Sequence, residues 1–287
     1  MANSENNKPF GIRMRRVFLE LARMRRAAEI TQSDAAKALS VVPSTVHRIE
    51  KSQRMLKRDD LLSLLMYYKA SRQMREALVA LYDKADEPGL LTREDLKLTD
   101  DLADWICFEQ TASKICNYEQ LLVPGLIQTI PYAIAVISSY GVQLTEQEVS
   151  DRVAARIARQ ALLRRPDSPQ FSVILHEAAL LQDVGGTEAM RGQLEYLAEI
   201  ALKPNVDIRV IPMRAGAHPG LGDGPFVVMD YADLPSLVHI EHKVASVYLE
   251  SLADIEAYKL AWDRLREVAL PPATSVRRIE EIARGLG

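Results

Sequence analysis

A proline inside an otherwise helical stretch constrains the fold of the first part of this chain most tightly. Pro43 interrupts the segment 31–51, which reads TQSDAAKALSVVPSTVHRIEK. Because proline lacks a backbone N–H and its ring clashes with the preceding turn, it is excluded from helix interiors but fits the first turn. Thr31 stands where the N-cap of an earlier helix belongs. The segment therefore predicts two short helices, 32–39 and 43–51, joined by a tight turn.

The apolar residues of these two helices fall where a helix-turn-helix needs them. Ala36 occupies the point where the helices would touch, Ser40 falls in the turn, and Val46 and Ile49 lie on the inner side of the second helix. The outer side of the second helix is then left to polar and basic residues. The spacing predicts a DNA-binding unit whose second helix enters a major groove.

The predicted contact residues are hydrogen-bond donors that can reach base edges or phosphates. Those expected near bases are Ser44, Thr45, His47 and Arg48, and those expected toward phosphates are Gln32, Lys51 and Arg54. The alternative interpretation is a plain two-helix hairpin with a solvated basic face. Charge favours DNA, because residues 1–87 carry 17 Lys and Arg against 11 Asp and Glu, a net charge of +6.

The rest of the chain has the opposite charge, with 19 Lys and Arg against 28 Asp and Glu, a net charge of -9. The sequence Asp86-Glu87-Pro88-Gly89 breaks the helical pattern, and the residues up to Asp101 are charged and poor in apolar side chains. We therefore expect a DNA-binding domain at 10–87, a linker at 88–100 and a sensor or dimerisation domain at 101–287.

Beyond the linker, helical and alternating patterns interleave. Helices are predicted at 102–108, 129–139, 176–182, 187–202, 252–270 and 275–286, and Thr145 with Glu148 forms a capping box for a helix running to about residue 165. Strands are predicted at 114–118, 171–175, 206–212, 226–229 and 237–240. The fold class is multidomain: an all-α, five-helix domain followed by a mixed α/β (α+β) domain with helices covering a mixed sheet.

We find no complete catalytic motif in the sequence. His176-Glu177 begins like a zinc-protease motif, but Leu180 stands where the second histidine belongs. The glycine-rich loop 216–224 precedes a strand, so it is either a long strand connection or a ligand lid, with His218 and Asp223 as its candidate ligand residues. Of the three function classes, an enzyme is therefore the least favoured, after a transcriptional regulator and a protein that sequesters a partner.

We expect no cofactor and no metal, because Cys107 and Cys116 have no companions at metal-ligand spacing. No stretch reaches the roughly 18 apolar residues of a membrane helix, and the first residues lack the apolar core of a signal peptide. These features predict a cytoplasmic protein without a membrane partner.

The pattern TQxxxAxxL…STVxRIE resembles the Xre/Cro-type helix-turn-helix, and the similarity covers roughly residues 13–85. The resemblance implies a five-helix DNA-binding domain in which Arg25 and Glu50 form a structural ion pair. The sequence departs from the pattern at three places. Glu29 and Ser40 stand where glycine is common, and Val42 stands where a Ser or Thr cap is usual.

The C-terminal part also resembles a known group. Phrases such as YEQLLVPGLIQT (118–129), NVDIRVIPMRAGAHPGLGDGPF (205–226) and YLESLADIEAYKLAWDRL (248–265) are similar to the domain of unknown function that follows the helix-turn-helix in actinobacterial WhiJ-like and antitoxin-like regulators. The resemblance implies a transcriptional regulator that binds double-stranded DNA. We expect a homodimer on an inverted repeat, with a small-molecule effector or a small protein as partner; the alternative is an antitoxin-like protein that sequesters that partner and autoregulates its operon.

Overall fold

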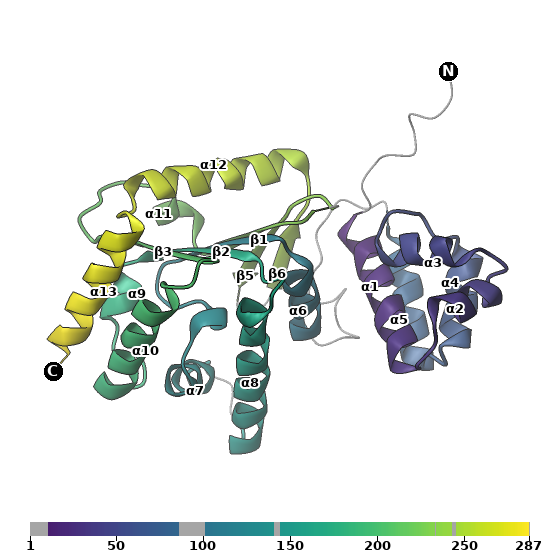
Figure 1. The fold of residues 1–287 in the computed structure, drawn as a ribbon, viewed down its shortest axis with the longest axis horizontal. Coiled ribbons are helices and arrows are strands. Elements are labelled where there is room, and N and C mark those ends of the chain that lie inside the picture. The colour runs from purple at the N-terminus through teal and green to yellow at the C-terminus, as the bar shows by residue number, and fades with distance from the viewer. Residues whose placement is uncertain (1–10, 86–100, 141–143, 233, 243–244, 287) are drawn as a thin grey trace. The chain divides into compact units, whose positions relative to one another are not determined.

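The computed structural model describes residues 11–85, 101–140, 144–232, 234–242 and 245–286 (Figure 1). The predicted linker 88–100 lies outside these residues. Contacts divide the chain into two compact units. The first comprises residues 1–108, 233–237 and 241–252, and the second comprises 109–232, 238–240 and 253–287. Below, residues 11–85 are called the N-terminal module and the second unit the C-terminal body.

The N-terminal module is a bundle of five helices, as predicted. They are α1 (Ile12–Ala27), α2 (Gln32–Ala38), α3 (Pro43–Glu50), α4 (Arg58–Tyr67) and α5 (Arg72–Asp83). Helix α1 packs against α3 and α5, α2 packs against α3 and α4, and α4 packs against α5. Val17, Phe18, Leu61 and Leu65 are fully buried among them. This small apolar core fixes the position of the two central helices, α2 and α3.

Helix α1 buries charged side chains together with apolar ones. Val17 and Leu21 are buried, and so are Arg15 and Arg16, with 2% of each exposed. Arg16 forms an ion pair one turn along the helix with Glu20, whose Oε1 lies 3.3 Å from Nη2. Helical spacing shows on which face of a helix a side chain lies. It does not show which other elements pack against that face.

Four turns in the N-terminal module place a non-glycine residue in the left-handed region. Glu29, Ser40, Ser52 and Lys69 have φ angles of 56°, 55°, 54° and 55°. At Ser40, its N–H donates to the Lys37 carbonyl (3.0 Å) and the next N–H donates to the Ala36 carbonyl (2.9 Å). This pair of bonds is the Schellman ending, which usually uses glycine. The departures from glycine noted at Glu29 and Ser40 therefore fall on strained backbone.

The strands form one mixed sheet in the order β3-β2-β1-β4-β5-β6. The strands are β1 (Lys114–Glu119), β2 (Gln170–His176), β3 (Val206–Ile211), β4 (Phe226–Asp230), β5 (Leu237–His242) and β6 (Ala245–Leu249). Strand β2 runs parallel to β1 and β3, whereas β4 is antiparallel to β1; Tyr118 lies opposite Ile174 and Phe226. Four consecutive β1 residues are buried, as expected where both faces of a sheet are covered.

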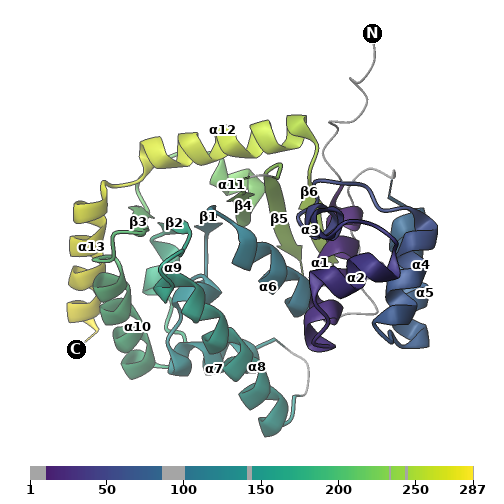
Figure 2. The same cartoon turned by 45° about the vertical axis from the view of Figure 1, so that its right-hand side comes forward.

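Helices supply both covering layers. Figures 1 and 2 show α12 along one face of the sheet and α7, α8 and α10 on the other. Eight α-helices of the described residues follow α5: α6 (Asp101–Thr111), α7 (Ile130–Ser138), α8 (Glu146–Arg159), α9 (Ala178–Leu181), α10 (Thr187–Ile200), α11 (Gly220–Asp223), α12 (Leu252–Val268) and α13 (Pro272–Gly285). The mixed sheet with helical layers confirms the predicted fold class.

The predicted capping box starts α8. The Thr145 N–H donates to Glu148 Oε2 (2.7 Å), and the Glu148 N–H donates to Thr145 Oγ1 (3.3 Å). The helix ends at Arg159, and residues 160–164 continue as a 3₁₀ turn, so the predicted α-helix to residue 165 was too long. Its apolar stripe is only partly covered, since Val153 is buried and Val149 is half-buried.

Strand β6 and the short helix α11 were not predicted. Strand β6 spans only five residues, ASVYL, and it joins the sheet as the neighbour of β5. Helix α11 lies inside the glycine-rich loop and spans four residues. Both are too short to produce a clear periodic pattern, and the structure of α11 also depends on a residue distant in sequence, since Gly220 is buried against the phenol of Tyr118.

Candidate nucleic-acid interface

The turn between α2 and α3 is built largely as its residues predict. Thr31 caps α2, because its Oγ1 accepts a hydrogen bond from the Asp34 N–H at 3.1 Å. Ser40 closes that helix in the left-handed conformation, and Pro43 is the first residue of α3. The N-cap of α3 is Val42, which offers no side-chain acceptor. A missing cap typically costs about 1 kcal/mol, so packing must hold the start of α3 in place.

That packing comes from small and branched apolar side chains. Ala36 of α2 is 1% exposed, and Val46 and Ile49 of α3 are 1% and 3% exposed. All three lie where the helix-turn-helix interpretation placed them. Because α2 and α3 contact each other along these residues, the opposite side of α3 faces outward.

A polar network joins the ends of three helices. Both carboxylate oxygens of Glu50 accept hydrogen bonds from Arg25, at 2.6 Å from Nε and 3.0 Å from Nη2. Gln32 Nε2 donates to Glu50 Oε2 at 2.8 Å, and Arg25 Nη1 donates to the Ile30 carbonyl at 2.7 Å. Arg25 and Glu50 thus form the ion pair that the resemblance implied. The ion pair ties the end of α3 to α1 and to the start of α2.

Burial strengthens this network. The side chains of Arg25 and Glu50 are 11% and 7% exposed. The hydrogen bonds that Arg25 donates to Glu50 raise the pKa of Arg25, and burial, followed by the charge of Glu50, raises the pKa of the neighbouring Tyr68. Removing one member of such a buried pair leaves an uncompensated charge, which costs about 3–5 kcal/mol. Glu50 is therefore a structural residue of α3.

Most of the predicted contact residues lie on the outer side of α3. Ser44, His47, Arg48 and Lys51 are all exposed. Gln32 is half-buried at the first turn of α2, and its amide is engaged with Glu50, as described above. The structure thus brings four of the seven predicted residues together on one exposed helical face.

Thr45 lies elsewhere. Its side chain is 5% exposed, and its Oγ1 accepts a hydrogen bond from Nη1 of Arg54 at 3.1 Å. A buried threonine beside Val46 and Ile49 does not face solvent as Ser44 and Arg48 do. The predicted base contact at Thr45 therefore does not fit its position, and its visible role is to hold Arg54.

The exposed side of α3 is electrostatically positive. Residues 42–57 contain four Lys or Arg and a single carboxylate, Glu50, which is already engaged with Arg25. Within the part of the chain that the structure describes, no ion pair forms at any of the four cations, which are Arg48, Lys51, Arg54 and Lys57. By contrast, Arg58 and Arg72 pair with Asp83 and Glu76. Uncompensated cations beside hydrogen-bond donors suit a polyanion such as DNA.

The second candidate place, the glycine-rich loop, packs partly against the sheet. His218 is half-buried and its ring centroid lies 5.9 Å from that of His176. Burial, and secondarily the charge of His176, lowers the pKa of His218. Asp223 points to solvent, while Gly220 is buried against the phenol of Tyr118, where a side chain would clash. The loop therefore packs on the end of β1, which is consistent with a strand connection.

The rejected zinc-protease residues have a structural use. Glu177 is 5% exposed; its Oε1 accepts from Arg278 Nε at 2.5 Å and its Oε2 from the Met213 N–H at 2.7 Å. Burial raises the pKa of Glu177, but these hydrogen bonds outweigh burial and hold it below the usual value. Among the described residues, no three His, Cys, Asp or Glu side chains come close enough to hold a metal ion.

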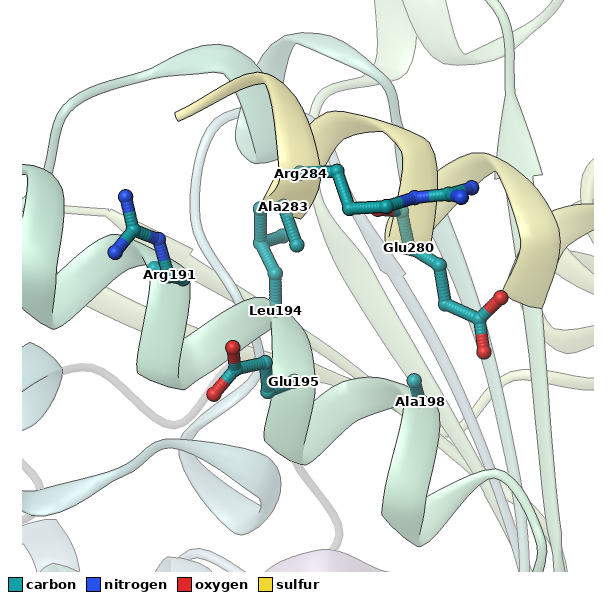
Figure 3. Close-up of a pocket in the computed structure, with 7 residues that line it drawn as sticks. All are labelled: Arg191, Leu194, Glu195, Ala198, Glu280, Ala283 and Arg284. Carbon is teal, nitrogen blue, oxygen red and sulfur yellow. The ribbon is translucent and has the colours of Figure 1, made fainter. Parts of the chain in front are cut away.

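Sequence reasoning missed one surface feature, a groove of about 610 Å³ between α10 and α13 (Figure 3). Leu194, Ala198 and Ala283 form its apolar part, and Arg191, Glu195, Glu280 and Arg284 supply charged groups. The two helices lie far apart in sequence, so only their tertiary contact creates the groove. The amphipathic pattern of each helix was the only sequence signal.

The described side chains of the other histidines and cysteines are buried. His239 on β5 is 6% exposed, and burial lowers its pKa to about 3. Cys116 is a buried free thiol, whose pKa burial raises to about 11. The side chains of Cys107 and His242 lie outside the described residues. None of the helices in the described ranges combines the length and apolar character that a membrane crossing requires.

Comparison with known proteins gives two family matches. Residues 102–281, more than half of the chain, match the family described as Domain of unknown function (DUF5753). Residues 19–78 match a family described as Helix-turn-helix domain, and this range contains α2 and α3 in full. No curated protein and no solved structure matches the chain.

Proposed function

The chain belongs to the family of the Domain of unknown function (DUF5753), and because a helix-turn-helix domain precedes that domain, we propose that it is a sequence-specific DNA-binding transcriptional regulator. One observation carries the proposal. The exposed face of α3 presents hydrogen-bond donors and cations, and the one carboxylate within the described residues 42–57, Glu50, is held by Arg25. Such a face fits the negative, donor-and-acceptor-rich major groove.

The proposed contacts follow from exposure. Ser44, His47 and Arg48 contact base edges, and Lys51 and Arg54 contact phosphates. Thr45 is left out of the base contacts because it is buried. Gln32 retains a proposed phosphate-side role at the start of α2, because one N–H of its Nε2 binds Glu50 and orients the amide while the second N–H can donate to a phosphate.

We further propose three functional segments, with the DNA-binding domain at 10–87, the linker at 88–100 and the C-terminal domain at 101–287. The family matches at 19–78 and 102–281 support this division. The C-terminal domain dimerises in this proposal, so the operator is an approximate inverted repeat with half-site centres about 34 Å apart, one turn of DNA. Signal reception, by a small molecule or a partner protein, also belongs to this domain.

The test begins with selection of bound genomic fragments by the purified full-length protein. Binding of the best fragment is then measured across a salt series for wild type and for Arg48→Ala. We expect Arg48→Ala to weaken binding by roughly 10- to 100-fold. Arg72→Ala is the matched control, because Arg72 is exposed on α5 and pairs with Glu76. Equal affinities for the wild type and Arg48→Ala would remove Arg48 from the interface.

A second candidate function is sequestration of a small partner protein, as in antitoxin-like and WhiJ-like regulators, with DNA binding serving autoregulation. The groove between α10 and α13 favours it, since its apolar floor and charged flanks suit a protein segment better than a nucleotide (Figure 3). Co-purification from the native host discriminates the two functions. A stoichiometric small protein supports sequestration, and its absence supports a regulator that receives its signal otherwise.

A further inference from the structure

We propose that Thr45 is a positioning residue, which holds the guanidinium of Arg54 against the flank of the recognition helix α3 as a preset phosphate contact. This inference rests on the proposed DNA-binding function. It changes the role of Thr45, which the sequence predicted as a base contact, and keeps Arg54 as the phosphate contact. Thr45 acts through Arg54, and Arg54 touches the DNA.

The geometry begins with the hydrogen bond across the end of α3. Arg54 lies beyond the helix in the loop before α4, nine residues after Thr45, and its Nη1 lies 3.1 Å from Thr45 Oγ1. Thr45 is 5% exposed, so its hydroxyl is a fixed point in the protein. The long Arg54 side chain therefore folds back along α3 and does not extend freely into solvent.

The anchor places this cation close to the proposed base contacts. Thr45 and Arg48 are three residues apart on α3, so they are neighbours on its surface. Ser44 precedes Thr45 directly and is exposed. A guanidinium held at Thr45 consequently lies beside the exposed face that Ser44 and Arg48 form.

Arg54 also keeps its charge and donors for an external anion. Among the residues that the structure describes, it forms no ion pair, and its only hydrogen bond uses Nη1. Arg58, four residues on, is different, because its Nε and Nη2 both bind the carboxylate of Asp83. A planar guanidinium with uncommitted N–H groups matches phosphate geometry.

Holding the side chain in advance has a defined consequence for binding. A free arginine loses rotamer freedom when it docks on a phosphate, and that loss weakens the complex. The bond to Thr45 removes part of this freedom before DNA arrives. Thr45→Val keeps the branched shape and burial but deletes the acceptor, so it should weaken DNA binding without disturbing the core.

The experiment measures binding of the full-length protein to the genomic fragment selected by wild type, across a salt series. We expect Thr45→Val to weaken binding roughly 3- to 10-fold. Arg54→Ala should weaken it more and reduce the salt slope by about one. In the double variant, Thr45→Val should add no further loss to that of Arg54→Ala, because its effect passes through Arg54.

Thr45→Ser retains a hydroxyl and should bind nearly as wild type does, which separates the hydrogen bond from a packing defect. Thermal unfolding followed by circular dichroism verifies that each variant is folded. The inference is overturned if Thr45→Val binds as wild type does, or if it weakens binding equally with and without Arg54. If both Thr45 variants unfold, Arg54→Ala with an unchanged salt slope still overturns it. Wild type that selects no fragment, or Arg48→Ala without effect, would instead overturn the proposed function itself.

Discussion

The N-terminal module and the C-terminal body solve the same backbone problem with different residues. In the described part of the module, every residue with positive φ is a non-glycine residue: Glu29, Ser40, Ser52 and Lys69. In the described part of the body, every such residue is a glycine: Gly185, Gly186, Gly216 and Gly224. Since a side chain in the left-handed region costs about 1 kcal/mol or more, the module carries strain at four turns that the body avoids.

The difference shows where each region obtains its stability. At its described positions of positive φ the body uses glycine, which adopts these angles without a steric cost. The module instead relies on tertiary contacts, namely the Glu50 network and the buried faces of α2 and α3, to hold strained turns in place. Its helix α3, which also lacks a side-chain cap at Val42, depends on those contacts most.

The largest expected effect comes from removing the contact that holds the module together. Glu50→Ala leaves Arg25 without its carboxylate and Gln32 without its acceptor, so the module should lose about 3–5 kcal/mol of stability. Hydrogen exchange of peptides from residues 12–83 measures this loss separately from the body. Glu76→Ala is the control, because its pair with Arg72 is 65–85% exposed and should contribute under 1 kcal/mol. Equal exchange in the two variants would contradict the dependence of the module on this network.

A glycine of the body gives the next largest effect. At Gly185, φ is 81°, and an added Cβ would lie 3.0 Å from the Cβ of Ala135 and 3.2 Å from that of Ala189. Gly185→Ala should therefore cost about 2–3 kcal/mol through backbone strain and crowding. Gly192→Ala is the matched control, because Gly192 lies inside α10 with open space around it. That change should stabilise the body by up to about 1 kcal/mol, measured by chemical denaturation.

The same contrast explains what the sequence could and could not reveal. Thr31, Pro43 and the Thr145–Glu148 box are local signals, and the helices that they start begin where predicted. The mixed α/β class followed from alternating strands for the same reason. Strand β6 was missed because it spans only five residues, too few for an alternating pattern to stand out from a loop.

In the candidate interface, helical spacing predicts the burial of most single side chains but not of all. Helical spacing correctly put Val46 and Ile49 inside, and it left Ser44, His47 and Arg48 outside. Thr45 lies at the border between the two sides, where spacing alone does not decide burial. The hydrogen bond from Arg54, which comes from a loop nine residues away, shows what that border residue does. Loop conformation of this kind is not encoded in periodicity.

Acid should lower the stability of the C-terminal body through a buried histidine. His239 in the body is buried and its pKa is lowered to about 3, whereas His47 in the module is exposed. Below about pH 6.5, the ordinary pKa of histidine, His239 is protonated in the unfolded chain but stays neutral in the folded body. The free energy of unfolding therefore falls as the pH drops from about 6.5 toward 3. The slope should reach about 1.4 kcal/mol per pH unit. In His239→Gln, this part of the pH dependence of unfolding should vanish; an unchanged slope would place its origin elsewhere.

The smallest effects address the strained turns directly, and they have the opposite sign. Ser40→Gly relieves the left-handed strain between α2 and α3, and it should stabilise the module by about 1 kcal/mol, less the greater freedom of glycine in the unfolded chain. Ala80→Gly, in the exposed interior of α5, is the matched control and should cost about 1 kcal/mol. Opposite shifts in hydrogen exchange would confirm that conformation decides the sign. If Ser40→Gly also destabilised the module, the Ser40 side chain would have to stabilise the fold by more than its backbone strain destabilises it. The difference in residue type between the turns of the module and those of the body would then not be a difference in strain.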